Sequence, residues 1–313
     1  MRKYGEYSLL LTILFLTIDN VSVANDYQNN HSNGTILYTM VIVCDDYLAN
    51  ADAHLLIFDN KLTYAIDAGG NKKFADYLIK NNIKRINKLF ISHWHKDHYG
   101  GLFELIKAGI IIDELYFNKL PKKDLCDREK PWGCDYEDIL NTIRFLDNNK
   151  VKFHTLKSGD VFTPMQDATV SVLFACGSIT GSVKCPDIND TSVILKLSFG
   201  TISILFSGDV NKTIGNFLVK NNYNLKASIL KVPHHGTEGV VENIFFDAVE
   251  PQLALVPAAK VLWLSNRSKR IREYFKEKKI PVLVSGINGD VTITINKHIF
   301  STNYHAAGSE VFR

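Results

Sequence analysis

Four residues with metal-ligating side chains are crowded into six positions of ISHWHKDHYGG, residues 91–101. They are His93, His95, Asp97 and His98, and they follow an apolar run. Histidines two residues apart in an extended segment can point to the same side, while Asp97 and His98 follow at the next turn. One set of nitrogen donors and one mixed set of oxygen and nitrogen donors suit two metals bridged by water or a carboxylate. The alternative, a cluster of structural core histidines, is disfavoured by this spacing.

Two later apolar segments also end in residues that can bind metal. Asp209 closes the strand pattern ISILFSGD, where an unpaired buried carboxylate would be costly. His234 and His235 close the pattern ASILKVPHHG. If these segments end at one edge of a sheet sandwich, their side chains meet the histidine-rich segment. The residues alone do not decide which of the two histidines is the ligand.

Short apolar strand patterns alternate with helical patterns along most of the chain. Examples are the strands YTMVIVC (38–44) and TSVILKLSFG (191–200), and the amphipathic helix DYEDILNTIRFLDNN (135–149). Two runs of strands, each with its helices, predict an α/β fold in which two sheets pack face to face with helices outside, a four-layer αββα sandwich. We expect one domain over residues 40–303, followed by a C-terminal tail over 304–313.

Residues 1–24 have the pattern of a secretory signal peptide. Arg2 and Lys3 precede an apolar run, and small residues precede position 25. The run is shorter than the roughly twenty residues needed to cross a bilayer, although a retained membrane anchor is the alternative. We expect a secreted or periplasmic protein without a stable membrane anchor, beginning with a flexible segment over residues 25–39.

Four cysteines are paired along the chain in loop-like stretches. Cys126 and Cys134 bracket one stretch, and Cys176 and Cys185 bracket the other. Both pairs predict disulfides that staple surface loops in an oxidising compartment. Zinc ligation is less favoured because the spacings are wider than those of zinc ribbons.

The overall composition is that of an ordinary globular protein, with 46% hydrophobic and 22% charged residues. The net charge of +3 is too small to imply a nucleic-acid or membrane partner. A basic stretch over residues 266–279 could follow a nucleic-acid backbone. We favour the alternative, the solvated face of a helix whose Ile271, Tyr274 and Phe275 pack inward.

The sequence resembles the metallo-β-lactamase superfamily, whose histidine signature matches residues 93–98 and whose strand-ending aspartate matches Asp209. The closer resemblance is to the lactamase-like domain of competence proteins of the ComEC/Rec2 type. Their patterns are matched by IDAGG (66–70), SHWHKDHYGG (92–101), NDTSVILKL (189–197), FSGD (206–209) and LKVPHHGT (230–237). The resemblance implies the metallo-β-lactamase fold over nearly the whole chain after the leader.

The resemblance also implies two divalent metal ions, zinc or, as the alternative, manganese. The implied ligands are His93 and His95 for one metal, Asp97, His98 and either His234 or His235 for the other, and Asp209 as the bridge. The superfamily's usual further histidine is absent. His154 falls too early in the sequence, and Asn189 stands there instead, as in the competence-type relatives. The first metal is therefore expected to be weaker, hydrated or exchangeable.

The chemistry that the resemblance implies is hydrolysis by a metal-bridged hydroxide. The expected catalytic residues are Asp97, Asp209 and His235. The side chains expected to bind substrate or stabilise its charge are those of Asn189, Thr237 and Lys96, together with the histidine of the 234/235 pair that is not a ligand. Asp67 is expected to accept a hydrogen bond from a ligand histidine and so orient it, or else to cap a turn.

The resemblance favours phosphodiester substrates, with DNA among the candidates. An ester, lactone or β-lactam hydrolase is a second hypothesis, which the missing histidine disfavours. A non-catalytic binding protein on the same scaffold is a third. The sequence carries no competence-type membrane channel, so we expect a free-standing secreted relative without an obligate protein partner.

Overall fold

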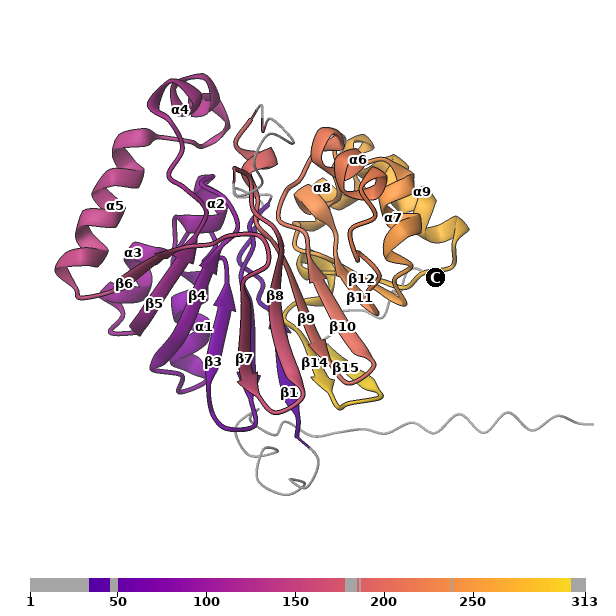
Figure 1. Cartoon of the computed structure of the whole chain (residues 1–313), viewed down its shortest axis with the longest axis horizontal. Helices are drawn as coiled ribbons and strands as arrows, with labels where there is room; N and C mark the ends of the chain where they lie inside the picture. The colour runs from indigo at the N-terminus through magenta and orange to yellow at the C-terminus, as the bar shows by residue number, and fades with distance from the viewer. Residues whose placement is uncertain (1–33, 46–49, 178–184, 186, 238, 305–313) are drawn as a thin grey trace, which may run out of the picture. The chain divides into compact units, whose positions relative to one another are not determined.

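The computed structural model describes residues 34–45, 50–177, 185, 187–237 and 239–304 (Figure 1). The predicted signal peptide and most of residues 25–39 lie outside the described residues, as do residues 305–313 of the predicted tail. Strand β1 begins at Ile36 and pairs on both sides. The predicted flexible segment is therefore wrong from Ile36 onward, because Ile36 and Tyr38 are buried in the core. In the described part of the chain, none of the helices has the length and apolar character needed to span a bilayer.

The first sheet contains eight strands among the described residues, in the order β15-β14-β1-β2-β3-β4-β5-β6. From β3 to β6 neighbouring strands are parallel, and the other pairs are antiparallel. The strands are β1 (Ile36–Met40), β2 (His54–Phe58), β3 (Thr63–Ile66), β4 (Arg85–Ile91), β5 (Ile111–Phe117), β6 (Lys152–Thr155), β14 (Val291–Ile295) and β15 (Phe300–Tyr304).

The second sheet contains seven strands in the described ranges, in the order β13-β12-β11-β10-β9-β8-β7. From β10 to β13 neighbouring strands are parallel, and from β7 to β10 they are antiparallel. The strands are β7 (Val161–Met165), β8 (Ala168–Phe174), β9 (Ile194–Phe199), β10 (Ile202–Phe206), β11 (Ile229–Lys231), β12 (Leu253–Val256) and β13 (Val282–Val284).

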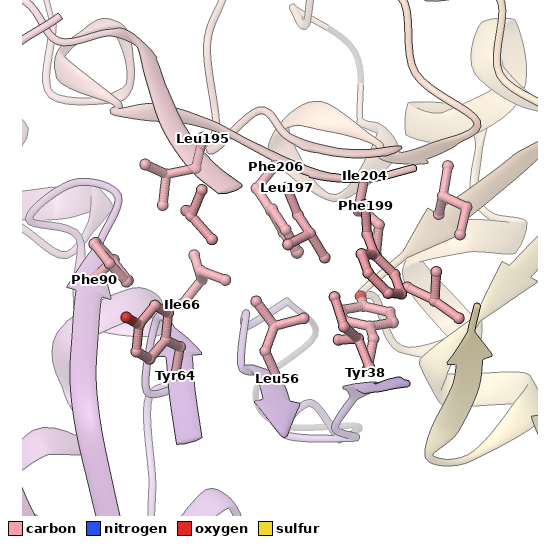
Figure 2. Close-up of a cluster of buried hydrophobic side chains, with 14 of the residues drawn as sticks. Tyr38, Leu56, Tyr64, Ile66, Phe90, Leu195, Leu197, Phe199, Ile204 and Phe206 are labelled. Carbon is pink, nitrogen blue, oxygen red and sulfur yellow. The ribbon is translucent and has the colours of Figure 1, made fainter. Parts of the chain in front are cut away.

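The two sheets face each other across a buried apolar core. Figure 2 shows Tyr38, Leu56 and Phe90 of the first sheet facing Leu195, Leu197 and Phe206 of the second across the core. Alternate residues of a strand share a face of its sheet, so the remaining buried side chains of these strands lie on the outer faces and pack under helices. Each sheet therefore buries apolar side chains on both of its faces.

Helices cover the outer face of each sheet and complete the predicted four-layer αββα sandwich. Those on the first sheet are α1 (Lys73–Lys80), α3 (Leu102–Lys107) and α5 (Tyr136–Asn148). Those on the second are α6 (Lys212–Lys220), α7 (Asn243–Val249), α8 (Lys260–Leu264) and α9 (Lys269–Glu277). Ile271, Tyr274 and Phe275 of α9 are buried, which confirms that this basic stretch is one face of an amphipathic helix.

Shorter helical segments connect these elements, and several of them carry residues of the predicted site. They are α2 (Lys96–Tyr99), α4 (Lys123–Glu129), η2 (Lys130–Trp132), η3 (Asn189–Thr191), η4 (Pro233–Gly236), η5 (Asn266–Ser268) and α10 (Ser285–Asn288). The carboxyl ends of parallel neighbours meet at one edge of a sheet. The pairs β3–β4 and β10–β11 are such neighbours, and the predicted ligands follow directly after these strands.

Candidate metal centre

Four side chains from three separate segments converge on one buried point. The His235 Nε2 atom lies 3.1 Å from Asp209 Oδ2 and 3.2 Å from Asp97 Oδ2. The His98 Nε2 atom lies 3.3 Å from the same Asp209 oxygen. One ligand atom from each of the four residues lies within 4.8 Å of all the others. Two imidazole nitrogens and two carboxylate oxygens form a donor set that suits a divalent metal such as zinc.

The backbone of η4 selects His235 rather than His234 for this cluster. His234, His235 and Gly236 have positive φ angles of 49°, 54° and 71°, a left-handed conformation that is uncommon for residues other than glycine. This sharp turn at the end of β11 buries the His235 side chain completely, whereas His234 is partly exposed and is not among the four converging ligands. The choice that the sequence left open is therefore made by local backbone geometry.

His98 and His235 are oriented by hydrogen bonds from their Nδ1 atoms, the ring nitrogens that are not directed at the cluster. His98 Nδ1 donates to Asp67 Oδ2 at 2.8 Å, and His235 Nδ1 donates to the carbonyl oxygen of Pro257 at 3.0 Å. Asp67 also accepts hydrogen bonds from the Ser92 amide and hydroxyl, at 2.7 and 2.8 Å. Such bonds fix the tautomer and ring orientation of metal-binding histidines. The structure thus places Asp67 where the sequence predicted it, beside a ligand histidine.

Two charged residues that sequence reasoning missed complete the cluster. Lys231 Nζ lies 2.9 Å from Asp209 Oδ1 and 2.5 Å from Asp52 Oδ2, and it donates to the carbonyl oxygen of Gly208 at 2.7 Å. Asp52 Oδ1 lies 3.2 Å from His235 Nδ1. Both residues are about 1% exposed. The available signal was weak: a lysine inside the apolar stretch ASILKV, and an aspartate just before the apolar strand β2.

Opposite charges in this cluster shift each other's pKa values strongly. Burial alone would raise the pKa of Asp209, but the positive charges of His235, Lys231 and His98 hold it well below its usual range. Burial likewise would lower the pKa values of His98 and His235, but neighbouring carboxylates, Asp209 above all, raise both well above the ordinary histidine value. The metal-free cluster is therefore stabilised by protons on two of the residues that would bind metal.

The charge balance also fits a bound cation. The cluster contains four carboxylates, those of Asp52, Asp67, Asp97 and Asp209, and one ammonium group, that of Lys231, which contacts Asp52 and Asp209. With neutral histidines this leaves an excess of three negative charges in a buried site. Buried charges are strongly unfavourable unless they are paired or bind metal. The donor set and its charge thus both fit divalent metal.

The other two predicted histidines, His93 and His95, lie directly beside this cluster. The His93 Nε2 and His95 Nδ1 atoms are 3.2 Å apart, and the His93 ring centroid is 4.0 Å from that of His98. Burial lowers the pKa values of His93 and His95. Among the described residues, no third His, Cys, Asp or Glu ligand atom joins this pair at the close spacing of the first cluster. Asn189 lies beside His95 and favours its protonated form.

Two other residues predicted for the site, Lys96 and Thr237, occupy different environments. Lys96 is exposed and pairs with Asp138 of α5 at 3.2 Å, so its ammonium group is engaged away from the ligand cluster. Thr237 is buried, and its hydroxyl donates to the His234 carbonyl oxygen at 2.9 Å. His154 lies in β6 and stacks on Tyr116, as expected for an ordinary strand residue.

A disulfide-stapled segment is anchored on the histidine motif. Cys126 and Cys134 form a disulfide with their Cα atoms 5.1 Å apart, and this closes the segment that contains α4 and η2. The Lys96 amide donates to the Gly133 carbonyl oxygen at 3.0 Å. The predicted pairing of Cys176 with Cys185 is also formed, with Cα atoms 6.5 Å apart. The first disulfide therefore fixes this segment against the histidine motif.

An αββα sandwich with a two-part histidine and aspartate centre at its strand ends defines a class of metal-dependent enzymes. The sequence matches the family model of the metallo-beta-lactamase superfamily over residues 53–258, and the chain belongs to this superfamily. It is accordingly a metal-dependent hydrolase.

Individual relatives agree with this family assignment. ComE operon protein 3 of Bacillus subtilis (strain 168) is 26% identical over 228 residues, which make up 71% of this chain and 26% of that protein. This chain thus spans about a quarter of the length of that relative. A mutant of the CmlA beta-hydroxylase of Streptomyces venezuelae superposes with a TM-score of 0.51 at 12% identity, covering 83% of this chain and 54% of that one. The latter similarity supports the fold alone.

Proposed function

We propose that this hydrolase is a phosphodiesterase that uses two divalent metals, with zinc as the first candidate and manganese as the second. The observation that carries the proposal is the adjacency of the two ligand groups. The His93 and His98 rings are 4.0 Å apart, and Asp209 interacts electrostatically with histidines of both groups. Two adjacent metals suit displacement at phosphorus because they can stabilise the attacking and the leaving oxygen together. The resemblance of the sequence motifs to the lactamase-like domain of competence proteins favours the same substrate class.

Individual residues would have separate roles in metal binding and in contact with the substrate. When bound, divalent metals would lower the pKa of a bound water and polarise the phosphate ester. Asp209 would bridge the two groups, and Lys231 would hold its second oxygen in place. Asp97 accepts a hydrogen bond from the side-chain Nδ2 atom of Asn50 at 2.5 Å, and this bond orients the Asp97 carboxylate. His234, whose Nδ1 has no hydrogen-bond partner among the described residues, would donate to a substrate oxygen.

We further propose that the protein acts outside the cytoplasm, on phosphodiesters that include DNA. The two disulfides support this location, because such bonds persist in oxidising compartments. Residues 1–24 are proposed to be removed during export. N-terminal sequencing of the exported protein tests this, and a first residue other than Asn25 would place the cleavage elsewhere.

The decisive test of the proposed activity is hydrolysis of bis(4-nitrophenyl) phosphate. The protein is stripped of metal and titrated with Zn²⁺ or Mn²⁺, with Asp209→Ala run alongside. We expect metal-dependent turnover in the parent protein and a loss of at least about a thousandfold in the variant. Asp76→Ala, an exposed position on α1, is the matched control and should retain full activity.

Other outcomes would redirect the proposal. Turnover of 4-nitrophenyl acetate, a lactone or nitrocefin, without phosphodiester cleavage, would make the protein a carbonyl hydrolase. Two tightly bound metals with no turnover of any of these substrates would contradict the proposed activity and leave a binding role.

A further inference from the structure

The ligand histidines share a pattern in how their two ring nitrogens are used. In His98 and His235 the Nδ1 atom donates to an oxygen of the protein, and Nε2 faces the metal cluster. His93 follows the same arrangement, with Nδ1 3.1 Å from the Ser92 hydroxyl and Nε2 directed at His95. One nitrogen of each ring is thus available to a metal, while the other is fixed by the protein.

His95 uses its nitrogens the other way round. Its Nδ1 faces His93 Nε2 at 3.2 Å, so Nδ1 is the atom placed to share a metal with His93. A metal on Nδ1 leaves the proton on Nε2, which must then donate to an acceptor. His95 is 5% exposed, and its Nε2 atom is buried without a hydrogen-bond partner among the described residues.

The Glu129 carboxylate lies beside this nitrogen. Its Oε2 atom is 3.9 Å from His95 Nε2, and the side chain is 19% exposed. This separation exceeds that of a hydrogen bond, but such contacts are often long in the ligand-free state and shorten when the site is loaded. The imidazole is fixed in the core, so the gap would close by rotation of the Glu129 side chain.

The position of Glu129 is determined by the disulfide-stapled segment. Glu129 is the last residue of α4, and its carbonyl oxygen accepts from the Cys134 amide at 3.3 Å. Cys126 and Cys134 are buried and covalently joined. The same segment is bonded to Lys96, next to His95, through Gly133. The carboxylate and the imidazole are therefore held by one rigid connection.

We propose that Glu129 is a positioning residue that accepts a hydrogen bond from the Nε2–H group of His95 and so orients the Nδ1 atom of His95 toward the metal shared with His93. The inference rests on the two-metal centre of the proposed function and deepens it. It gives the disulfide-stapled segment a role: to supply the carboxylate that supports the His93/His95 site, in which the described residues provide two histidines. A carboxylate that accepts a hydrogen bond from the second ring nitrogen of a metal-binding histidine typically contributes about 10- to 100-fold to metal affinity.

Metal affinity, measured without substrate, tests this role. The metal-free full chain is titrated with Zn²⁺ by calorimetry and with Co²⁺ by visible absorption. The binding step that disappears in His95→Ala is assigned to the His93/His95 site. In Glu129→Gln we expect this step to weaken about 10- to 100-fold, while the other step changes by less than about twofold. Glu129→Asp, which keeps the carboxylate on a side chain shorter by one methylene, should recover part of the affinity.

Two further variants show whether the effect is specific to Glu129. Asp127→Asn removes a carboxylate from the same helix, but Asp127 is exposed and pairs with Lys123, so both binding steps should stay unchanged. Asn189→Ala tests the other side chain beside His95. Circular dichroism of the metal-free variants reports whether they fold.

The proposal is overturned by any of three results: parent-like binding in Glu129→Gln, equal weakening of both steps, or weakening of the His95 step in Asn189→Ala alone. A selective loss in Glu129→Gln would uphold the positioning role even if the protein cleaved no phosphodiester. In that case only the proposed phosphodiesterase function would be rejected, and the positioning role of Glu129 would stand.

Discussion

Lys231 is a buried cation held between the carboxylates of Asp52 and Asp209. Burial would lower its pKa, but these two carboxylates raise it instead, so the ammonium stays charged inside the core. It neutralises part of the excess negative charge of the metal centre. A buried charge that loses its partner typically costs about 3–5 kcal/mol.

Replacing Lys231 with methionine should therefore destabilise the metal-free protein by about 3–5 kcal/mol. Bound metal should offset part of this loss, because it supplies positive charge to the same carboxylates. Urea unfolding with EDTA and with Zn²⁺ measures both effects. The matched control is Lys196→Met on β9, where the ammonium contacts Asn224 and no ion pair is formed among the described residues. Equal destabilisation by the two substitutions would contradict the charge argument.

The two ligand groups should also differ in how metal binding depends on pH. The pKa values of His98 and His235 are raised, so both are protonated near pH 7 in the metal-free state. Metal needs the neutral imidazole, so affinity at their site should rise with pH, with release of about two protons per metal. The pKa values of His93 and His95 are lowered, so their site should release almost none. Calorimetry in buffers of different ionisation enthalpy counts these protons, and equal release at both sites would contradict the prediction.

The junction between α2 and α3 determines where the histidine motif meets the loop after β3. The Gly101 amide donates to the Gly69 carbonyl oxygen at 2.8 Å, and the Ala68 amide donates to the His98 carbonyl oxygen at 2.7 Å. These bonds connect the segment of Asp67 to the segment of His98. A Cβ atom on Gly101 would overlap the carbonyl oxygen of Ala68, so glycine is required by the close approach of two backbones.

Gly101→Ala should therefore lower stability by about 1–3 kcal/mol or more and weaken metal binding, because it separates Asp67 from His98. Gly109→Ala is the comparison. Its φ of 77° makes alanine cost about 1–2 kcal/mol, yet an added Cβ meets nothing within 4 Å. Its metal affinity should equal that of the parent protein. Zn²⁺ titration and urea unfolding distinguish the two, and a parent-like affinity in Gly101→Ala would refute the argument.

At the scale of the whole molecule, the core between the sheets holds the two halves of the metal centre together. His93, His95, Asp97 and His98 follow β4 of the first sheet, whereas Asp209 follows β10 of the second. Phe206, the last residue of β10, lies 5.8 Å from Tyr38 and 5.5 Å from His54 between ring centroids, across the sheet interface. Contacts of this kind fix the distance between the two sets of ligands.

Phe206→Ala should destabilise the protein by about 3–5 kcal/mol, the usual cost of removing a buried aromatic ring. Ile299→Ala, at a side chain that is 65% exposed, should change stability by less than about 0.5 kcal/mol. Urea unfolding of both variants measures the difference. Similar values for the two would show that the sheet interface contributes little.

Local patterns were sufficient to predict the sandwich and most of the side chains that cluster at its strand ends. Period-two strands and amphipathic helices indicated four layers, because burial on one or both faces leaves a periodic trace in the sequence. The spacing of the motif at residues 93–98 and the polar ends of apolar strands pointed to side chains that the structure brings together at the candidate metal centre. These features are carried by neighbouring residues, so they can be read without knowledge of the fold.

The tertiary structure alone decided the remaining features. It selected His235 over His234 by a left-handed turn, brought Asp52 and Lys231 together, engaged Lys96 with Asp138, and placed Glu129 beside His95. Each of these depends on a backbone angle or on a contact between segments far apart in the chain. A charge and its distant partner leave no periodic signal in either segment, because their interaction energy exists only once folding has brought them within a few ångströms and removed the water between them.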